Sequence, residues 1–172
     1  MKTKFTFIFI LAFGLLLTNC KEKEQTVEVE EVKIDLINDE FGEEKAEVMA
    51  LMDELKQTIK DGDIEKLIAF HAYSPKFTEF KNGAPRNGGK ANEEHERAVF
   101  GNVTEVVKFE YDDLKIAVYD NVANVTFHSD FHLKFGEDEA VVNDQITLLL
   151  VKTDMGWKCV HEHHSPLKKE DS

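Results

Sequence analysis

The sequence predicts an α+β domain in which helices pack on one face of a mostly antiparallel sheet. Apolar residues recur at helical spacing in the first part of the domain, and from Thr104 onward they alternate at the period of a strand. Residues 146–151 are apolar on both faces, as expected for a strand in the interior of a sheet. Helices followed by a meander of long strands are typical of this fold class.

Two helices open the domain. Residues 44–60, EKAEVMALMDELKQTIK, form the first, because one side carries an apolar stripe made of Val48, Met52, Leu55 and Ile59. Gly62 suits the position just after its end, and Asp63 suits the N-cap of a second helix over residues 64–71. A Ser-Pro pair stops the second helix, since the residue before a proline avoids helical geometry.

A short strand over residues 76–80 comes next. Residues 81–90, KNGAPRNGGK, are rich in glycine and proline and predict an exposed loop. A third helix follows, with Asn92 as its N-cap, and runs through about Phe100. It completes the helical part of the domain.

The strands begin with a hairpin. Residues 107–120 and 122–135 are joined at Asp120-Asn121, and the second strand has one apolar face, made of Ala123, Val125, Phe127, Phe131, Leu133 and Phe135. The pair Asp112-Asp113 interrupts the alternation of the first strand, which predicts a bulge or bend. Residues 140–153 and 157–165 are expected to add two more strands.

The N-terminus resembles that of a bacterial lipoprotein. Residues 1–19 carry two lysines and then a short apolar run, typical of an export signal, and Leu-Thr-Asn-Cys resembles the site at which such signals are cut before an acylated cysteine, here Cys20. Residues 20–43 predict an acidic tether, in which Val32, Ile34 and Leu36 could form a short extra strand. The domain covers residues 44–167, and residues 168–172 form a C-terminal tail.

Charge and cysteine content narrow the partners. The formal net charge is −13, so contact with nucleic acid is not expected. Once Cys20 is acylated, Cys159 is the one remaining cysteine and has no partner for an internal disulfide. The lipid on Cys20 places the protein in the bacterial cell envelope, anchored to the outer membrane and either periplasmic or surface-exposed.

Two stretches of the domain carry a family resemblance. An apolar strand followed by Gly-Trp and V-H-x-H-x-S, together with GDIEKLIAFHAYSPKFTEF, resembles the SnoaL-like branch of the nuclear transport factor 2 (NTF2) and ketosteroid isomerase superfamily. The ending also resembles the association domain of calmodulin-dependent kinase. This resemblance implies a cone in which three N-terminal helices pack on a strongly bent sheet, with a pocket at the open end. Because proteins with this fold have different functions, the fold alone does not identify the function of this chain.

The stretch GWKCVHEHHSP supplies most of the candidate ligand-binding residues, which are Trp157, His161, His163, His164 and, from another strand, Tyr111. Regular alternation would place Trp157, Cys159, His161 and His163 on one face of the strand. No metal site is predicted, because the same strand lacks a third strong ligand at the right spacing. No catalytic residue can be assigned from the sequence.

Two functions remain open at this point. The favoured one is a membrane-anchored, non-catalytic module without a cofactor, whose pocket takes a small organic ligand and whose sheet pairs in a homodimer. The alternative is a cofactor-free isomerase or lyase in which one of His161, His163 and His164 carries the proton. A buried carboxylate or histidine facing a cavity would favour the enzyme.

Overall fold

A computed structural model describes residues 33–168, except for the side chains of residues 85–87. The predicted signal peptide, Cys20 and residues 21–32 of the tether lie outside the described residues. The chain divides into two units, Met1–Lys33 and Ile34–Ser172, and the second contains the domain. None of the helices among the described residues has the length and apolarity that crossing a membrane requires.

Three helices precede most of the strands, as predicted. Helix α1 (Gly42–Asp61) ends at Gly62, whose φ of 68° is the left-handed geometry that glycine adopts easily. Helix α2 (Ile64–Phe70) is capped by Asp63, whose Oδ1 accepts a hydrogen bond from the backbone nitrogen of Lys66 at 3.1 Å. The predicted cap and stop signals of these helices are confirmed. Residues 34 and 36 form no strand, because Asp35 folds them into a turn.

Helix α3 (Gly89–Phe100) starts earlier than predicted. Asn92 is fully buried inside the helix rather than at its N-cap, and it accepts a hydrogen bond from the Tyr73 hydroxyl at 2.6 Å. The helix begins at a glycine because any other residue there would place its Cβ only 2.7 Å from Cβ of Tyr73. The short strand predicted over residues 76–80 is β1 (Thr78–Lys81), whereas β2 (Ala84–Asn87) lies where a loop was predicted. Asn82 and Gly83, both with positive φ, make the tight turn between them.

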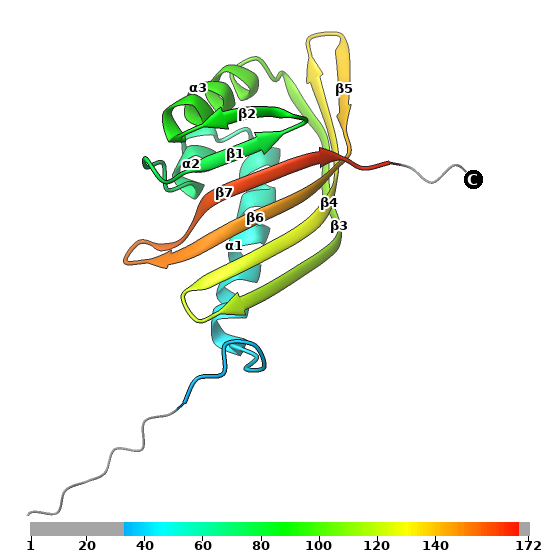
Figure 1. Cartoon of the computed structure of the whole chain (residues 1–172). Coiled ribbons are helices and arrows are strands. Elements are labelled where there is room, and N and C mark those ends of the chain that lie inside the picture. The colour runs from blue at the N-terminus through cyan, green and yellow to red at the C-terminus, as the bar shows by residue number, and fades with distance from the viewer. Residues whose placement is uncertain (1–32, 169–172) are drawn as a thin grey trace, which may run out of the picture. The chain divides into compact units, whose positions relative to one another are not determined.

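The remaining strands are β3 (Glu105–Tyr119), β4 (Val122–Phe135), β5 (Asp138–Val142), β6 (Asp144–Thr153) and β7 (Gly156–Pro166). They form one sheet with β1 and β2, in the order β2-β1-β7-β6-β4-β3, and β5 pairs with the end of β4 (Figure 1). All pairs are antiparallel except β1 with β7. Residues 138–153, predicted to contribute one strand from residue 140, are interrupted at Asn143.

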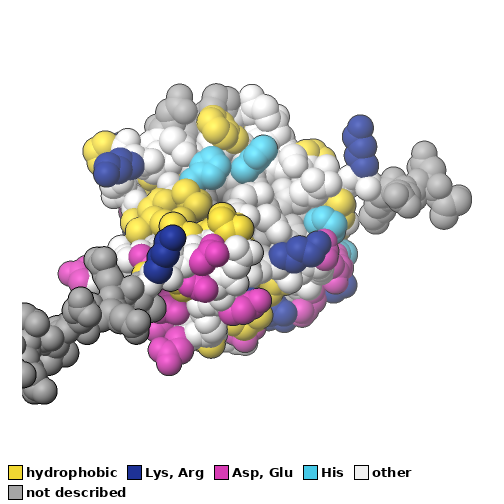
Figure 2. Space-filling model, turned by 60° about the horizontal axis from the view of Figure 1, so that its bottom comes forward, with side chains coloured by type: hydrophobic (Ala, Val, Ile, Leu, Met, Phe, Trp, Pro, Cys, Tyr) yellow, Lys and Arg dark blue, Asp and Glu magenta, His cyan; other side chains and the backbone are white. Residues whose placement is uncertain are grey.

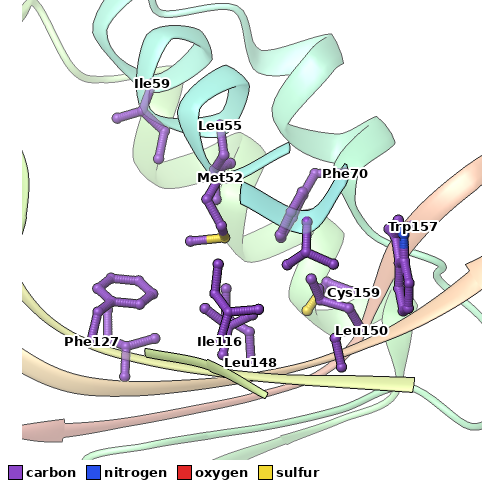
Figure 3. Packing of buried hydrophobic residues seen from close by; sticks show 14 of the residues in the cluster. Met52, Leu55, Ile59, Phe70, Ile116, Phe127, Leu148, Leu150, Trp157 and Cys159 are labelled. Atoms are coloured by element: carbon purple, nitrogen blue, oxygen red, sulfur yellow. The ribbon is translucent and has the colours of Figure 1, made fainter. Parts of the chain in front are cut away.

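The core lies between α1 and the inner face of the sheet. Met52 and Leu55 of α1 point toward Leu148, Leu150 and Phe127 of the strands, as Figure 3 shows. The apolar alternation predicted for β4 is confirmed, and β6 is an interior strand. The register of β3 shifts between Asp112 and Lys115, where Asp113 has φ of 52°, so the predicted bulge is confirmed.

Candidate functional site

A cavity of about 110 Å³ lies between the helices and the inner face of the sheet. Its walls are mostly apolar, and the apolar lining residues come from all three helices and four of the strands: Leu55, Ile59, Leu67, Phe70, Phe100, Phe109, Phe127, Phe131, Val142, Ile146 and Leu148. Its polar lining residues are His71, Lys81, Glu96, Ser129, Asp144, Glu162 and His164. Some lining residues, polar and apolar, are partly exposed. Lys81, Glu96 and Phe131 are among them and mark the mouth of the cavity.

A buried imidazole–carboxylate pair forms the polar centre. Nε2 of His71 lies 2.7 Å from Oε1 of Glu162, and both side chains are at least nine-tenths buried. Nδ1 of His71 donates to the carbonyl oxygen of Leu67 at 2.9 Å, so the proton on the other side of the ring is shared with Glu162. Burial lowers the pKa of His71, but Glu162 raises it more, and the net pKa is above the ordinary value. When His71 is protonated, the pair carries no net charge.

His164 extends this pair toward a second carboxylate. Its Nε2 lies 3.4 Å from Oε2 of Glu162, and its Nδ1 lies 4.0 Å from Oδ2 of Asp144. Burial raises the pKa of Glu162, but His71 and His164 lower it more, so the net pKa of Glu162 lies well below the usual range. Basic and acidic groups thus alternate from His71 to Asp144 along one wall of the cavity.

Glu96 is the carboxyl group whose ionisation is easiest to change near neutral pH. It projects from α3, and no described residue forms a hydrogen bond or ion pair with it. Burial, followed by the negative charge of Glu162, raises its pKa to about 7, although His71 and Lys81 act in the opposite direction. A carboxyl group that titrates near pH 7 beside an apolar cavity is a typical acid–base group.

A second layer of side chains holds these groups. The ring of His71 stacks on Tyr73 with centroids 4.9 Å apart, and the Tyr73 hydroxyl donates to Asn92. Nδ2 of Asn92 donates to Oε2 of Glu79 at 2.8 Å, and Glu79 lies opposite Glu162 in the parallel pair of β1 and β7. Helix α3 and strand β1 are thereby fixed against the residues that carry the pair.

A bulge in β7 changes which of its residues face the cavity. Leu149 pairs with His161, but Leu150 pairs with Cys159, so Val160 is an extra residue in the strand. Trp157, Cys159, Glu162 and His164 consequently face inward, whereas His161 and His163 face outward. The expectation that Trp157, Cys159, His161 and His163 share one face is wrong, because a one-residue bulge reverses the alternation after it.

Of the five candidate ligand-binding residues, His164 alone lines the cavity. Trp157 is a core residue whose Nε1 donates to Oε2 of Glu47 at 2.8 Å. Tyr111 packs between Phe109 and Phe127 and donates to the carbonyl oxygen of Met52. His161 and His163 lie on the outer face of the sheet, where both rings contact Phe80. Any binding role of these four residues remains a prediction for surfaces other than this cavity.

Sequence reasoning missed His71, Glu96 and Glu162 as site residues. His71 and Glu162 are 91 positions apart, and no local pattern indicates that they meet. Glu96 stands in a run of charged residues that is typical of an exposed helix face. Asp144 stands two residues before the apolar run 146–151, and an acid at the start of a buried strand is a usable signal for a buried carboxyl group.

Two sets of side chains offer ligand atoms close enough together to hold a metal ion. One set is His71, Cys159 and Glu162, and the other is Glu79, Glu162 and His164; within each, the atoms lie within 4.8 Å of one another. In the first set the direct contact of 2.7 Å between His71 and Glu162 would have to open to admit an ion. Burial, the largest effect, and Glu162 raise the pKa of the Cys159 thiol, which disfavours the thiolate that a metal requires.

Residues 48–168 match the SnoaL-like domain family. No curated protein matches the chain in sequence. Among solved structures, the fold is similar to a candidate dehydratase of the NTF2-like family from Streptomyces avermitilis, with a TM-score of 0.66, 17% identity, and coverage of 74% of this chain and 99% of that one. An NTF2-like superfamily protein from Salmonella enterica serovar Typhimurium gives a TM-score of 0.66 and 18% identity over 76% of this chain and 95% of that one.

A third similar structure is a candidate calmodulin-dependent kinase II association domain from Exiguobacterium sibiricum. Its TM-score is 0.60 at 16% identity, and the match covers 73% of this chain and 94% of that one. At these identities the structures show the fold alone. They confirm the predicted NTF2-like α+β architecture, with three helices packed on a curved, mostly antiparallel sheet.

Proposed function

This chain belongs to the SnoaL-like domain family, and we propose that its cavity binds a small organic molecule and moves a proton to or from it at Glu96. One observation carries the proposal: Glu96 faces an apolar cavity with a pKa raised to about 7 by burial and by Glu162. A group with this pKa is present in both protonation states at neutral pH, so it can accept a proton and return it.

Glu162 and Glu96 have different electrostatic environments and therefore different roles. Glu162 stays ionised because His71 and His164 stabilise its charge, whereas Glu96 has no such partner among the described residues. Two carboxyl groups with widely separated pKa values in one cavity support an assignment of Glu96 as the proton carrier and Glu162 as a fixed charge. The apolar walls exclude water from the ligand, which strengthens both effects.

Deuterium exchange tests the proton transfer. Small carbonyl compounds the size of cyclopentanone, with and without an amino group, would be incubated with the protein in heavy water, and deuterium incorporation next to the carbonyl would be followed by NMR. We expect the wild-type protein to accelerate exchange for members of this panel and Glu96→Gln to abolish the acceleration. Glu94→Gln is the matched control, because Glu94 is an exposed residue of the same helix paired with Lys90. Acceleration that survives Glu96→Gln would exclude Glu96 as the proton carrier.

The second candidate is the non-catalytic binding module favoured by the sequence. Five phenylalanine side chains line a cavity that is smaller than the several hundred Å³ typical of drug-sized ligands. Native mass spectrometry that finds a copurified ligand, combined with no deuterium exchange into that ligand, would favour this module over the enzyme.

We further propose that the protein is a lipid-anchored homodimer of the cell envelope. The sequence around Cys20 supports the anchor, and half-buried Leu149 and Val151 on the outer sheet face support pairing with a second copy. Figure 2 shows hydrophobic side chains gathered beside two histidines on one face of the molecule. The outer-face contacts of Phe80 with His161 and His163 agree with this arrangement.

A further inference from the structure

The polar part of the cavity offers mainly hydrogen-bond acceptors. Asp144, Glu96 and Glu162 contribute carboxyl groups, whereas the donors are Lys81 at the mouth and the histidine rings, which are directed at Glu162 and Asp144. The hydroxyl of Ser129 is already engaged, since it donates to the carbonyl oxygen of Val142 and accepts from the backbone of Asp144. A ligand that fits this lining has to bring its own donors.

Asp144 marks where such a donor would bind. Its side chain is 5% exposed, and its Oδ2 is buried without a hydrogen-bond partner. The nearest base is Nδ1 of His164 at 4.0 Å, which is too long for a hydrogen bond. A buried carboxylate oxygen left without a donor costs free energy, so a ligand that supplies one gains that interaction.

Much of the remaining lining is aromatic. The rings of Phe100, Phe109 and Phe131 pack in series, with centroids 6.2 Å apart for Phe100 and Phe131 and 4.5 Å apart for Phe109 and Phe131. Phe70 and Phe127 complete the aromatic part of the lining. Faces of aromatic rings attract an organic cation and also cover its apolar body.

Charge favours a cation over a neutral donor. The titratable groups that line the cavity come from α3 (Glu96), β6 (Asp144), β7 (Glu162, His164), the end of α2 (His71) and β1 (Lys81). The lining residues of α1, β3, β4 and β5 carry no charge. The His71–Glu162 contact engages one of the three carboxyl groups, which leaves Glu96 and Asp144 without an ion pair at hydrogen-bond distance. A charged donor forms a stronger hydrogen bond with a carboxyl group than a neutral donor does.

We propose that the ligand is a small protonated amine, whose ammonium group is held by Asp144 and whose apolar body lies against the phenylalanines. This inference rests on the proposed function for the use of the cavity but names the ligand class independently of any proton transfer. A cavity of about 150 Å³ holds benzene, so about 110 Å³ suits an apolar body no larger than a five-membered ring.

Three probes of one shape test the ligand class: cyclopentylamine, cyclopentanol and cyclopentanecarboxylate, each titrated into the purified full chain and followed by NMR. We expect the amine to bind about tenfold or more tightly than the alcohol, and the carboxylate to bind weakest. Asp144→Asn should weaken amine binding by about tenfold while changing alcohol binding little. Asp154→Asn, in the exposed turn before β7, is the matched control and should change neither.

Amine affinity should also rise between pH 6 and pH 8, because Glu96 loses its proton over this range while an alkylammonium keeps its own. Glu96→Gln should remove that rise. Equal binding of amine and alcohol, or of none of the three probes, would overturn the ligand class, and amine binding unchanged in Asp144→Asn would overturn the subsite. The results with the three probes and with Asp144→Asn do not bear on deuterium exchange at Glu96, so the ligand class and the proposed function fail or stand separately.

Discussion

At the scale of single residues, Glu96 links the site to the stability of the fold. A carboxyl group whose pKa is raised on folding binds more protons in the folded state, so it favours folding at low pH. Its stabilising effect is complete below the unfolded pKa of about 4.5 and is lost as the pH rises through about 7. Glu96→Gln removes the group that becomes unfavourable when it ionises. We therefore expect the substitution to raise the free energy of unfolding, relative to the wild type at the same pH, by roughly 1 to 3 kcal/mol more at pH 8 than at pH 4.5. Urea denaturation at both pH values measures this difference.

Other groups also change with pH in both proteins. Their contributions cancel in the comparison except where the charge of Glu96 acts on them, as it does on His71. His71, with a raised pKa, stabilises below about 6.5 and loses this effect as the pH rises through its folded pKa. Glu162, with a lowered pKa, stabilises above about 4.5 and loses this effect as the pH falls through its folded pKa. Glu94→Gln should keep the wild-type profile, and a Glu96→Gln profile parallel to that of the wild type would contradict the raised pKa.

Trp157 is expected to be a stability residue. Its side chain is 5% exposed, its Nε1 donates to Glu47, and Lys152 lies over its ring at 5.8 Å. We expect Trp157→Ala to lower the free energy of unfolding by about 3 to 5 kcal/mol through loss of a large buried ring. Trp157→Phe, which keeps part of the ring, should cost less, and an alanine variant within about 1 kcal/mol of the wild type would show that the ring is not part of the core.

At the scale of elements, the start of α3 depends on the absence of one side chain. A Cβ at Gly89 would lie 2.7 Å from Cβ of Tyr73 and 2.8 Å from its Cα, so the helix would have to move away. We expect Gly89→Ala to lower the free energy of unfolding by about 1 to 3 kcal/mol, measured by chemical denaturation. The displaced helix would also move Glu96, and the pKa of that carboxyl, followed by NMR, should fall toward its ordinary value.

Gly42 provides the matched control for this substitution. It opens α1, and a Cβ there would meet no atom within 4 Å. Gly42→Ala should be neutral or slightly stabilising, because alanine favours helices and restricts the unfolded chain. Equal effects of the two alanine substitutions would mean that the contact with Tyr73 does not hold α3 in place.

The elements also show why the fold was more predictable than the site. Apolar periodicity, the cap at Asp63 and the Asp112-Asp113 interruption are local signals, and each indicated its structure correctly. The bulge at Val160 has no local signal, because Val-His-Glu-His continues a regular strand pattern. The pair of His71 and Glu162 depends on parallel pairing of β1 with β7, which periodicity cannot reveal.

At the scale of the whole molecule, the outer sheet face is where we expect a second copy to bind. Leu149 lies half-buried at the centre of that face, in the interior strand β6. Leu149→Glu would bury a charge in the interface and should convert a dimer into a monomer in sedimentation velocity. Met155→Glu, in the exposed turn between β6 and β7, is the control and should leave the assembly unchanged. A wild-type protein that sediments as a monomer at micromolar concentration would contradict the homodimer.

The predicted lipid on Cys20 can be tested by fractionation. Cys20→Ser removes the acylation site, so the protein should leave the membrane fraction. Its circular dichroism and melting temperature should match those of the wild type released by detergent, because the domain starts well after this position. A variant that still sediments with membranes would show that something other than this cysteine anchors the protein.

The parallel pairing of β1 with β7 determines when the cavity can form during protein synthesis. Thr78 pairs with His161, and His71 contacts Glu162, so the cavity cannot be complete before β7 has been synthesised. Contacts between such distant positions close late and slowly. The site is therefore completed only near the end of synthesis, after the helices and the β3–β4 hairpin that form its other walls.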